Sequence, residues 1–133
     1  MITFDEFKKV EITVGKILSA EKVPETDKLL KLSVDLGLIQ TPLPVGTEEG
    51  GIPGESAPRT SSRDIRQIVS GISMYFPDPQ TLVGKKCMFV TNLAPRTIKG
   101  LESNGMLFAV STEDGKFSLL EPTGDIPEGT RAK

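Results

Sequence analysis

Apolar and polar residues alternate with a period of two along much of this chain, which predicts short β-strands. Between residues 10 and 23 the apolar positions Val10, Ile12 and Val14 share one face, and Gly15 follows them. A glycine inside such a run predicts a bulge or sharp bend. Further strands are expected, from the same alternation and the turn residues between the runs, over 29–36, 63–71, 86–91, 106–111 and 116–120.

Two short helices are predicted at the ends of polar turns. Residues 3–9 begin with Thr3, a favourable N-cap residue, and place Phe4 and Phe7 on one face, which we expect to pack against the sheet. Asp78 followed by Pro79 marks the start of a second helix, which Gly84 ends.

The alternation is lost over residues 37–62, which hold four prolines and five glycines. Proline removes a ladder donor and glycine weakens a strand, so this stretch cannot form an ordered ladder. The sequence predicts a long, mobile loop over 38–62, inserted between the second and third strands.

Five or six short strands, a small helix between the third and fourth, and a bending glycine in the first describe one domain over residues 1–133. The predicted fold class is all-β with short helices, a five-stranded Greek-key barrel of the OB-fold type. A β-sandwich shares many of these signals and remains the alternative.

Composition argues against an enzyme. The chain has no histidine, which removes the commonest general base and the commonest metal ligand. It has one cysteine, Cys87, so an internal disulfide is excluded. Cys87 lies in a strand pattern, where a buried thiol is expected. No catalytic residue, cofactor or metal is predicted. No apolar run reaches the roughly 20 residues of a membrane span, and the acidic start is unlike an export signal, so the expected location is the cytoplasm.

The net charge of −2 conceals a segregation of charge along the chain. Residues 59–101 carry seven cations and two acids, a local +5, and the rest carries nine cations and sixteen acids, or −7. Phosphates respond to the local field, which salt screens beyond about 8–10 Å. This pattern predicts a cationic face for a polyanion; the alternative is chance clustering on a solvated surface.

A set of cationic and polar residues around the predicted strands suits contacts to phosphates, ribose and base edges. Stacking platforms are few, since Tyr75 is the only tyrosine and tryptophan is absent, so recognition of a folded RNA by shape and backbone is favoured. The predicted contact residues are Lys28, Lys31, Arg66, Gln67, Ser70, Asn92, Arg96, Lys99, Ser103 and Asn104.

Several ordered motifs make the chain resemble the tRNA-binding OB-fold family, which includes the C-terminal domain appended to bacterial methionyl-tRNA synthetases. The motifs cover nearly the whole chain outside the insert. They are FKKVEITVGKI from residue 7, DKLL from 27, RQIVSGI from 66, YFPDP from 75, NLAPR from 92 and GLESNGML from 100.

The resemblance implies a non-catalytic domain that forms a homodimer and binds tRNA, either appended to the catalytic part of a methionyl-tRNA synthetase or free-standing. It places the contacts near Ser103 and Met106. The chain departs from the family at Thr13, Val23 and Asn104, where arginine, histidine and glutamate are common. The alternative is a chaperone-like dimeric module that binds proteins and not tRNA.

Overall fold

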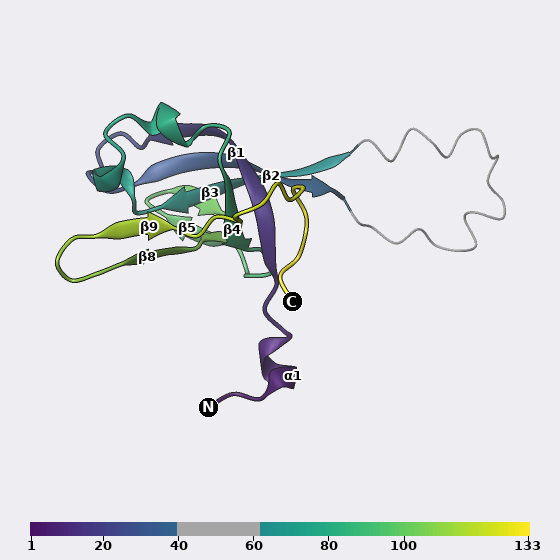
Figure 1. Cartoon of the computed structure of the whole chain (residues 1–133). Coiled ribbons are helices and arrows are strands. Elements are labelled where there is room, and N and C mark those ends of the chain that lie inside the picture. Colours follow the sequence, from purple (N-terminus) through teal and green to yellow (C-terminus); the bar gives the residue numbers. More distant parts are fainter. Residues whose placement is uncertain (40–61) are drawn as a thin grey trace, which may run out of the picture.

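The computed structural model describes residues 1–39 and 62–133 (Figure 1). The insert predicted for 38–62 therefore lies almost wholly outside the described residues. The elements are α1 (Phe4–Phe7), β1 (Ile12–Lys22), β2 (Leu30–Leu38), β3 (Arg63–Ser70), η3 (Ser73–Tyr75), η4 (Pro79–Leu82), β4 (Lys86–Val90), β5 (Arg96–Ile98), β6 (Leu101–Ser103), β7 (Met106–Leu107), β8 (Ala109–Ser111) and β9 (Phe117–Leu119).

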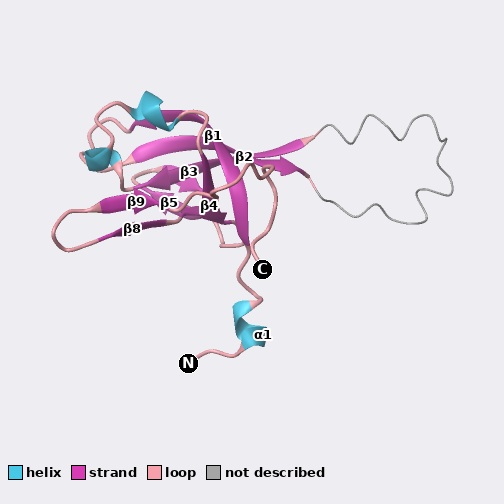
Figure 2. Cartoon of the chain, viewed as in Figure 1, coloured by secondary structure: helices cyan, strands magenta, loops and turns pink. Residues whose placement is uncertain are grey.

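Strands dominate the described residues (Figure 2) and form a five-stranded antiparallel sheet in the order β3-β2-β1-β4-β7. The long strand β1 pairs with β4 over Ile12–Lys16 and with β2 over Lys16–Lys22. Its two halves thus serve two neighbours, which requires the sheet to coil. The order 3-2-1-4 is the Greek-key arrangement.

The two edges of this sheet are brought together beside β6. Ser103 Oγ accepts a hydrogen bond from Val69 N at 3.0 Å, and Asn104 N donates to Gln67 O at 2.9 Å. These contacts join β3 to the segment that enters β7, so the sheet curls into an OB-like barrel. The predicted fold class is confirmed.

The core lies inside the curl and is built from the inward positions of β1 to β4. Phe89, Ile17 and Leu82 have no exposed surface; Leu82 comes from η4, which Asp78 caps through Gln80 N as predicted. Cys87 is buried, also as predicted, and burial raises the pKa of its thiol to about 12. The thiol is therefore protonated and unreactive at neutral pH.

Gly15 does not form the predicted bulge. The register of β1 against β2 shifts between Ile17 and Ser19 instead. Gly15 lies where three core side chains converge, and an added Cβ would come within 2.7 Å of Val34 Cγ1 and 2.8 Å of Phe89 Cδ1. The glycine is required for close packing.

Replacing Gly15 by alanine should lower the free energy of unfolding by about 1–3 kcal/mol, the usual effect of overpacking a core. Gly124→Ala is the matched control, since a Cβ there meets nothing within 4 Å. Urea unfolding monitored by circular dichroism measures both variants. Equal free energies of unfolding for the two variants would show that the core has room for a Cβ at Gly15.

The C-terminal tail adds a short strand-like segment to the start of β1. Gly129 N donates to Val14 O, and Ala132 N donates to Ile12 O, both at 2.8 Å. Glu128 fixes the tail by pairing with Arg63 at 3.2 Å and with Lys86 at 3.1 Å. A hydrogen bond from its own backbone and another from Lys86 lower the pKa of Glu128 below its ordinary value.

Acid should release this tail. A carboxylate with a depressed folded-state pKa stabilises above its unfolded pKa, and that contribution is lost as pH falls through the folded value. We expect the amide resonances of Gly129 and Ala132 to lose their native shifts only below the ordinary pKa of a glutamate side chain, because the pKa of Glu128 is lowered. In Glu128→Gln these two amide resonances should already depart from their native shifts at pH 7, and lowering the pH should cause no further transition. An acid transition that persists unchanged in this variant would contradict the assignment to Glu128.

Helix α1 forms as predicted but does not pack on the barrel. Thr3 and Glu6 make the reciprocal hydrogen bonds of a capping box. Phe4 and Phe7, expected to face the sheet, are 72% and 43% exposed, and α1 projects away from the barrel (Figure 1). No helix among residues 1–39 and 62–133 is long and apolar enough to cross a membrane.

Candidate nucleic-acid interface

A two-residue hairpin joins β5 to β6 and carries a cation at its tip. Ile98 pairs with Leu101, which leaves Lys99 and Gly100 as the loop, with φ of 51° and 83°. Two positive φ angles define a type I′ turn, which favours asparagine followed by glycine. Lysine at the first position is disfavoured by about 1 kcal/mol or more, a strain typical of functional sites. The alternation of apolar and polar residues predicted no strand between residues 92 and 105, so this hairpin was not expected.

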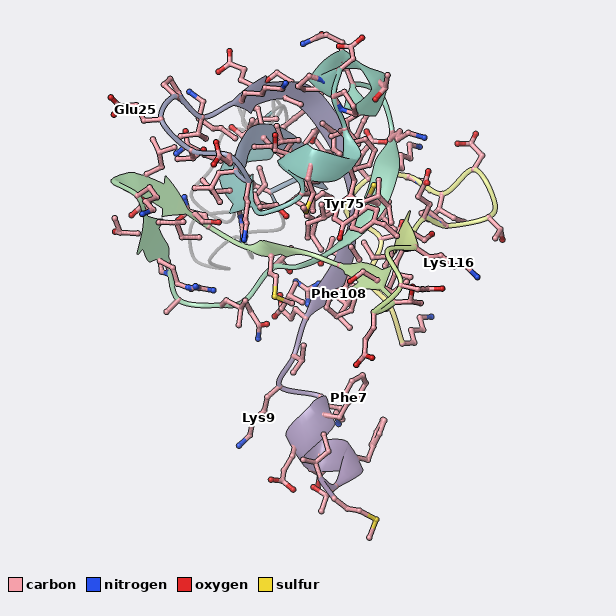
Figure 3. All side chains as sticks on the ribbon, turned by 90° about the vertical axis from the view of Figure 1, so that its left-hand side faces the viewer. Phe7, Lys9, Glu25, Tyr75, Phe108 and Lys116 are labelled. Carbon is pink, nitrogen blue, oxygen red and sulfur yellow. The ribbon has the colours of Figure 1, made fainter. Side chains whose placement is uncertain are left out.

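The tip of this hairpin faces the turn between β1 and β2 across a groove of about 350 Å³. We call it the lysine groove. Figure 3 looks onto this end of the barrel, where Glu25 marks the β1–β2 turn. The groove is lined by Glu25, Thr26, Asp27, Lys28, Leu29, Ile98 and Lys99.

Two of the predicted contact residues, Lys28 and Lys99, line this groove, and a third, Arg96, begins β5 in the same hairpin as Lys99. All three are exposed, and none forms an ion pair within 4.0 Å with a carboxylate in the described part of the chain. Glu25, like Lys99, has a positive φ, 66°, so both strained non-glycine residues found outside 40–61 line the lysine groove.

The sequence reasoning missed the acids of the groove. No local signal shows that Glu25 and Asp27, in the turn between β1 and β2, share a groove with Lys99, more than 70 positions further on. These carboxylates reduce the positive potential of the groove.

Arg66 uses its donors inside the barrel. Its guanidinium pairs with both carboxylate oxygens of Asp64 at 3.0 Å, and Nη1 donates to Thr91 O at 2.6 Å and to Asn104 O at 3.1 Å. These bonds tie β3 to the end of β4 and the entrance of β7. No finding tests the RNA contact predicted for Arg66. Because its charge is already paired with Asp64, we expect Arg66 to hold the barrel together and to contribute little to RNA binding.

Gln67, Ser103 and Asn104 are also brought together, at the junction between β3 and the segment that enters β7. We call this junction the seam. Gln67 Nε2 donates to Glu102 O at 2.9 Å, and Ser103 Oγ donates to Gly105 O at 3.1 Å. Ser103 is only 3% exposed, so its hydroxyl closes the barrel and does not face solvent. Ser70 is half-buried at the end of β3, opposite Leu30.

The remaining predicted residues lie apart from this cluster. Asn92 clamps the segment before β1, since its Oδ1 accepts from Glu11 N at 2.8 Å and its Nδ2 donates to Lys9 O. Lys31 pairs with Glu21 at 3.2 Å on the neighbouring strand. Met106 is 41% exposed on β7, opposite Val90.

The prediction that the cations of residues 59–101 form one cationic face is wrong for the described part of the chain. Four of its cations pair with carboxylates that the sequence places elsewhere or next to them: Arg63, Arg66, Lys85 and Lys86. Arg59 lies outside the described residues. The cationic surface narrows to Arg96 and Lys99, joined by Lys28 from the first loop.

An OB-like barrel that presents exposed lysines from two neighbouring loops is an architecture found in oligonucleotide-binding modules. Residues 59–131 match the family described as "Putative tRNA binding domain". The chain belongs to this family of tRNA-binding domains.

Similar proteins are linked by name to methionyl-tRNA synthetases and to chaperones. The methionine–tRNA ligase of Chloroherpeton thalassium is 38% identical over 132 residues, which are 99% of this chain and 15% of the ligase. A MetRS related protein from Pyrococcus horikoshii is 35% identical, with a TM-score of 0.74 over 100% of this chain and 98% of that one. A CsaA chaperone protein from Picrophilus torridus is 25% identical, with a TM-score of 0.71 over 100% of both chains.

Proposed function

We propose that this chain is a non-catalytic tRNA-binding domain that holds the RNA backbone at the lysine groove. The observation that carries the proposal is that Lys28 and Lys99 line the same groove from two different loops, and that Arg96 lies in the same hairpin as Lys99. Unpaired cations on two loops suit phosphates on a folded RNA, because such contacts orient the backbone without reading sequence.

Binding of this kind is weak in isolation and useful when tethered. We propose that the domain is appended to, or acts beside, the catalytic part of a methionyl-tRNA synthetase in the cytoplasm. The support is the coverage: the chain spans 15% of the length of its ligase relative, as one additional domain would. Tethering makes the second contact intramolecular, so a modest affinity can raise the apparent affinity for tRNA by about a hundredfold.

Salt dependence tests the proposal. We expect the affinity for fluorescein-labelled tRNA, measured by anisotropy, to fall about 15- to 60-fold between 50 and 200 mM salt, as two or three released counterions predict. Absence of binding at 50 mM salt, or an affinity that is flat over this range, would contradict the assignment.

Homodimerisation is the second part of the proposal, and exposed apolar side chains near the N-terminus support it. α1 has four residues, too few to be stable alone, and it presents Phe4 and Phe7 to solvent. Leu93, 43% exposed, and Val10, 42% exposed, continue the apolar surface near the start of β1. A second copy related by a two-fold axis offers the same surface in return.

Replacing Phe4 and Phe7 together by serine should convert the dimer to a monomer at micromolar concentration. Burial of four rings contributes on the order of 6 kcal/mol or more to association. Light scattering after size exclusion gives the mass. Val110→Ser is the control, since Val110 is 54% exposed on β8. A dimer that survives the double substitution would exclude α1 as the interface.

A chaperone-like protein-binding module is the alternative. The same exposed apolar residues and the likeness to a CsaA chaperone protein favour it. It predicts that an unfolded polypeptide binds and that tRNA does not compete. Our proposal predicts that tRNA binds in the absence of any protein partner.

A further inference from the structure

A second hollow, of about 430 Å³, opens on the barrel beside η3 and β9. Its volume is within the range of small-molecule sites. We call it the aromatic hollow. It is lined by Tyr75, Phe76, Lys85, Phe117, Ser118, Leu119 and Glu121.

Three aromatic rings that are distant in the sequence meet at this hollow. Tyr75 stacks on Phe117 with ring centroids 4.1 Å apart and an interplanar angle of 11°, and Phe76 meets Phe117 edge-on at 5.8 Å. All three are half-buried and pack on the outside of the core cluster. The assembled surface is a stacking platform, which the sequence, with its single tyrosine, argued against.

The aromatic hollow adjoins the lysine groove. Ser73 N, at the start of η3, donates to Lys28 O at 2.9 Å, and Tyr75 ends the same element. Two residues of 3₁₀-helix advance about 4 Å, so one short turn separates Lys28 from the rings. Figure 3 shows Tyr75 between Glu25 and Lys116 on this end of the barrel.

A cation stands at the edge of the hollow. Lys85 Nζ lies 3.9 Å from Glu121 Oε1, close to the limit for an ion pair, and the two side chains are 40% and 42% exposed. Such an exposed, long pair contributes little and exchanges readily for another anion. Rings beside this weakly paired ammonium match the base and the phosphate of one nucleotide.

We propose that the aromatic hollow receives an unpaired nucleobase of the RNA whose backbone lies in the lysine groove. This inference rests on the proposed function and extends it: the domain engages a junction between a helical and a single-stranded segment. The base stacks against the Tyr75–Phe117 pair, and its phosphate takes the place of Glu121 at Lys85. Cations on both sides of η3 favour a nucleotide over an apolar peptide.

Two RNA ligands and two variants at one position test the inference. The ligands are a hairpin with a 3′ single-stranded extension that contains 2-aminopurine and the same hairpin with blunt ends. Tyr75→Leu removes the ring and keeps an apolar side chain, and Tyr75→Phe keeps the ring. Circular dichroism establishes that each variant is folded, and Lys99→Asn reports on the lysine groove.

We expect wild-type protein and Tyr75→Phe to quench 2-aminopurine fluorescence on binding. Tyr75→Leu should bind the extended hairpin about tenfold more weakly, with the blunt hairpin unchanged. Lys99→Asn should weaken both ligands. If Tyr75→Leu affects neither ligand, or both equally, the base site is wrong while the proposed function stands. If Tyr75→Leu loses only its binding to an unfolded polypeptide, the hollow belongs to a protein partner. If the wild-type protein binds neither RNA, both proposals are overturned.

Discussion

Substituting Arg96→Gln and Lys99→Asn together should lower the affinity for tRNA about tenfold to a hundredfold at 100 mM salt. Each of these solvent-exposed side chains contributes about 0.5–1.5 kcal/mol of hydrogen bonding to a phosphate, and about 1.4 kcal/mol corresponds to a tenfold change in affinity. The slope of log affinity against log salt should fall in magnitude by about 1.5–2. Fluorescence anisotropy measures both quantities.

The choice of asparagine separates charge from turn geometry. Lys99 and Gly100 form a type I′ turn, and asparagine followed by glycine is its favoured sequence. Lys99→Asn should therefore leave the barrel at least as stable as wild type while it weakens RNA binding. Arg131→Ala is the control for loss of a cation, because Arg131 is exposed on the tail beside Glu11. An equal loss of affinity in Arg131→Ala would mean that net charge, and not the hairpin, governs binding.

Arg66→Met should destabilise the barrel by about 2–3 kcal/mol, because it leaves Asp64 without its partner and two carbonyl oxygens, of Thr91 and Asn104, without donors. Methionine keeps the apolar length of the side chain, so the change isolates the guanidinium. Urea unfolding followed by circular dichroism gives the difference in free energy.

The same variant tells a structural role from an RNA contact. Measured at a temperature where Arg66→Met is folded, its affinity for tRNA should lie within about twofold of wild type, since Arg66 offers its charge to Asp64. A variant with unchanged stability and a tenfold loss of affinity would reverse this assignment.

The periodic parts of the chain could be predicted because their burial is local in origin. The alternation that includes Ile12 and Val14 marks a strand whichever neighbours it pairs with, although Val10 lies before β1. The side chain of Asp78 caps the short helix that Pro79 begins, by accepting from Gln80 N. Gly15 shows the limit of this reasoning. A strand glycine signals either a bulge or a close approach, and only Val34 and Phe89, brought in by other strands, decide between them.

The candidate site was harder to predict because the type of a residue does not show in which direction its side chain points. Arg66, Gln67, Ser103 and Asn104 do gather at one place, as expected, but the curl of the sheet turns their polar atoms toward the seam that it must close. The charge pattern misled for the same reason. Lys86 belongs to a basic stretch in the sequence, yet it meets Glu128 from the tail.

Contacts between distant segments account for what sequence reasoning could not reach. Lys28 and Lys99 line one groove because the β1–β2 turn and the β5–β6 hairpin end at the same rim of the barrel. Tyr75 and Phe117 stack for a similar reason, since η3 and β9 flank one opening. Neither pair leaves a signal within any window of the chain.

We expect tRNA to contact the lysine groove and not the seam of the barrel. Amide chemical shifts of isotope-labelled protein during addition of tRNA test this most directly. We predict that the changes and the loss of signal concentrate in residues 24–29 and 96–101, extend to Tyr75 and Phe117 where an unpaired base enters the aromatic hollow, and reverse at 500 mM salt. Changes confined to residues 125–133, or to the seam at 64–67 and 102–104 with residues 24–29 and 96–101 unaffected, would contradict the account.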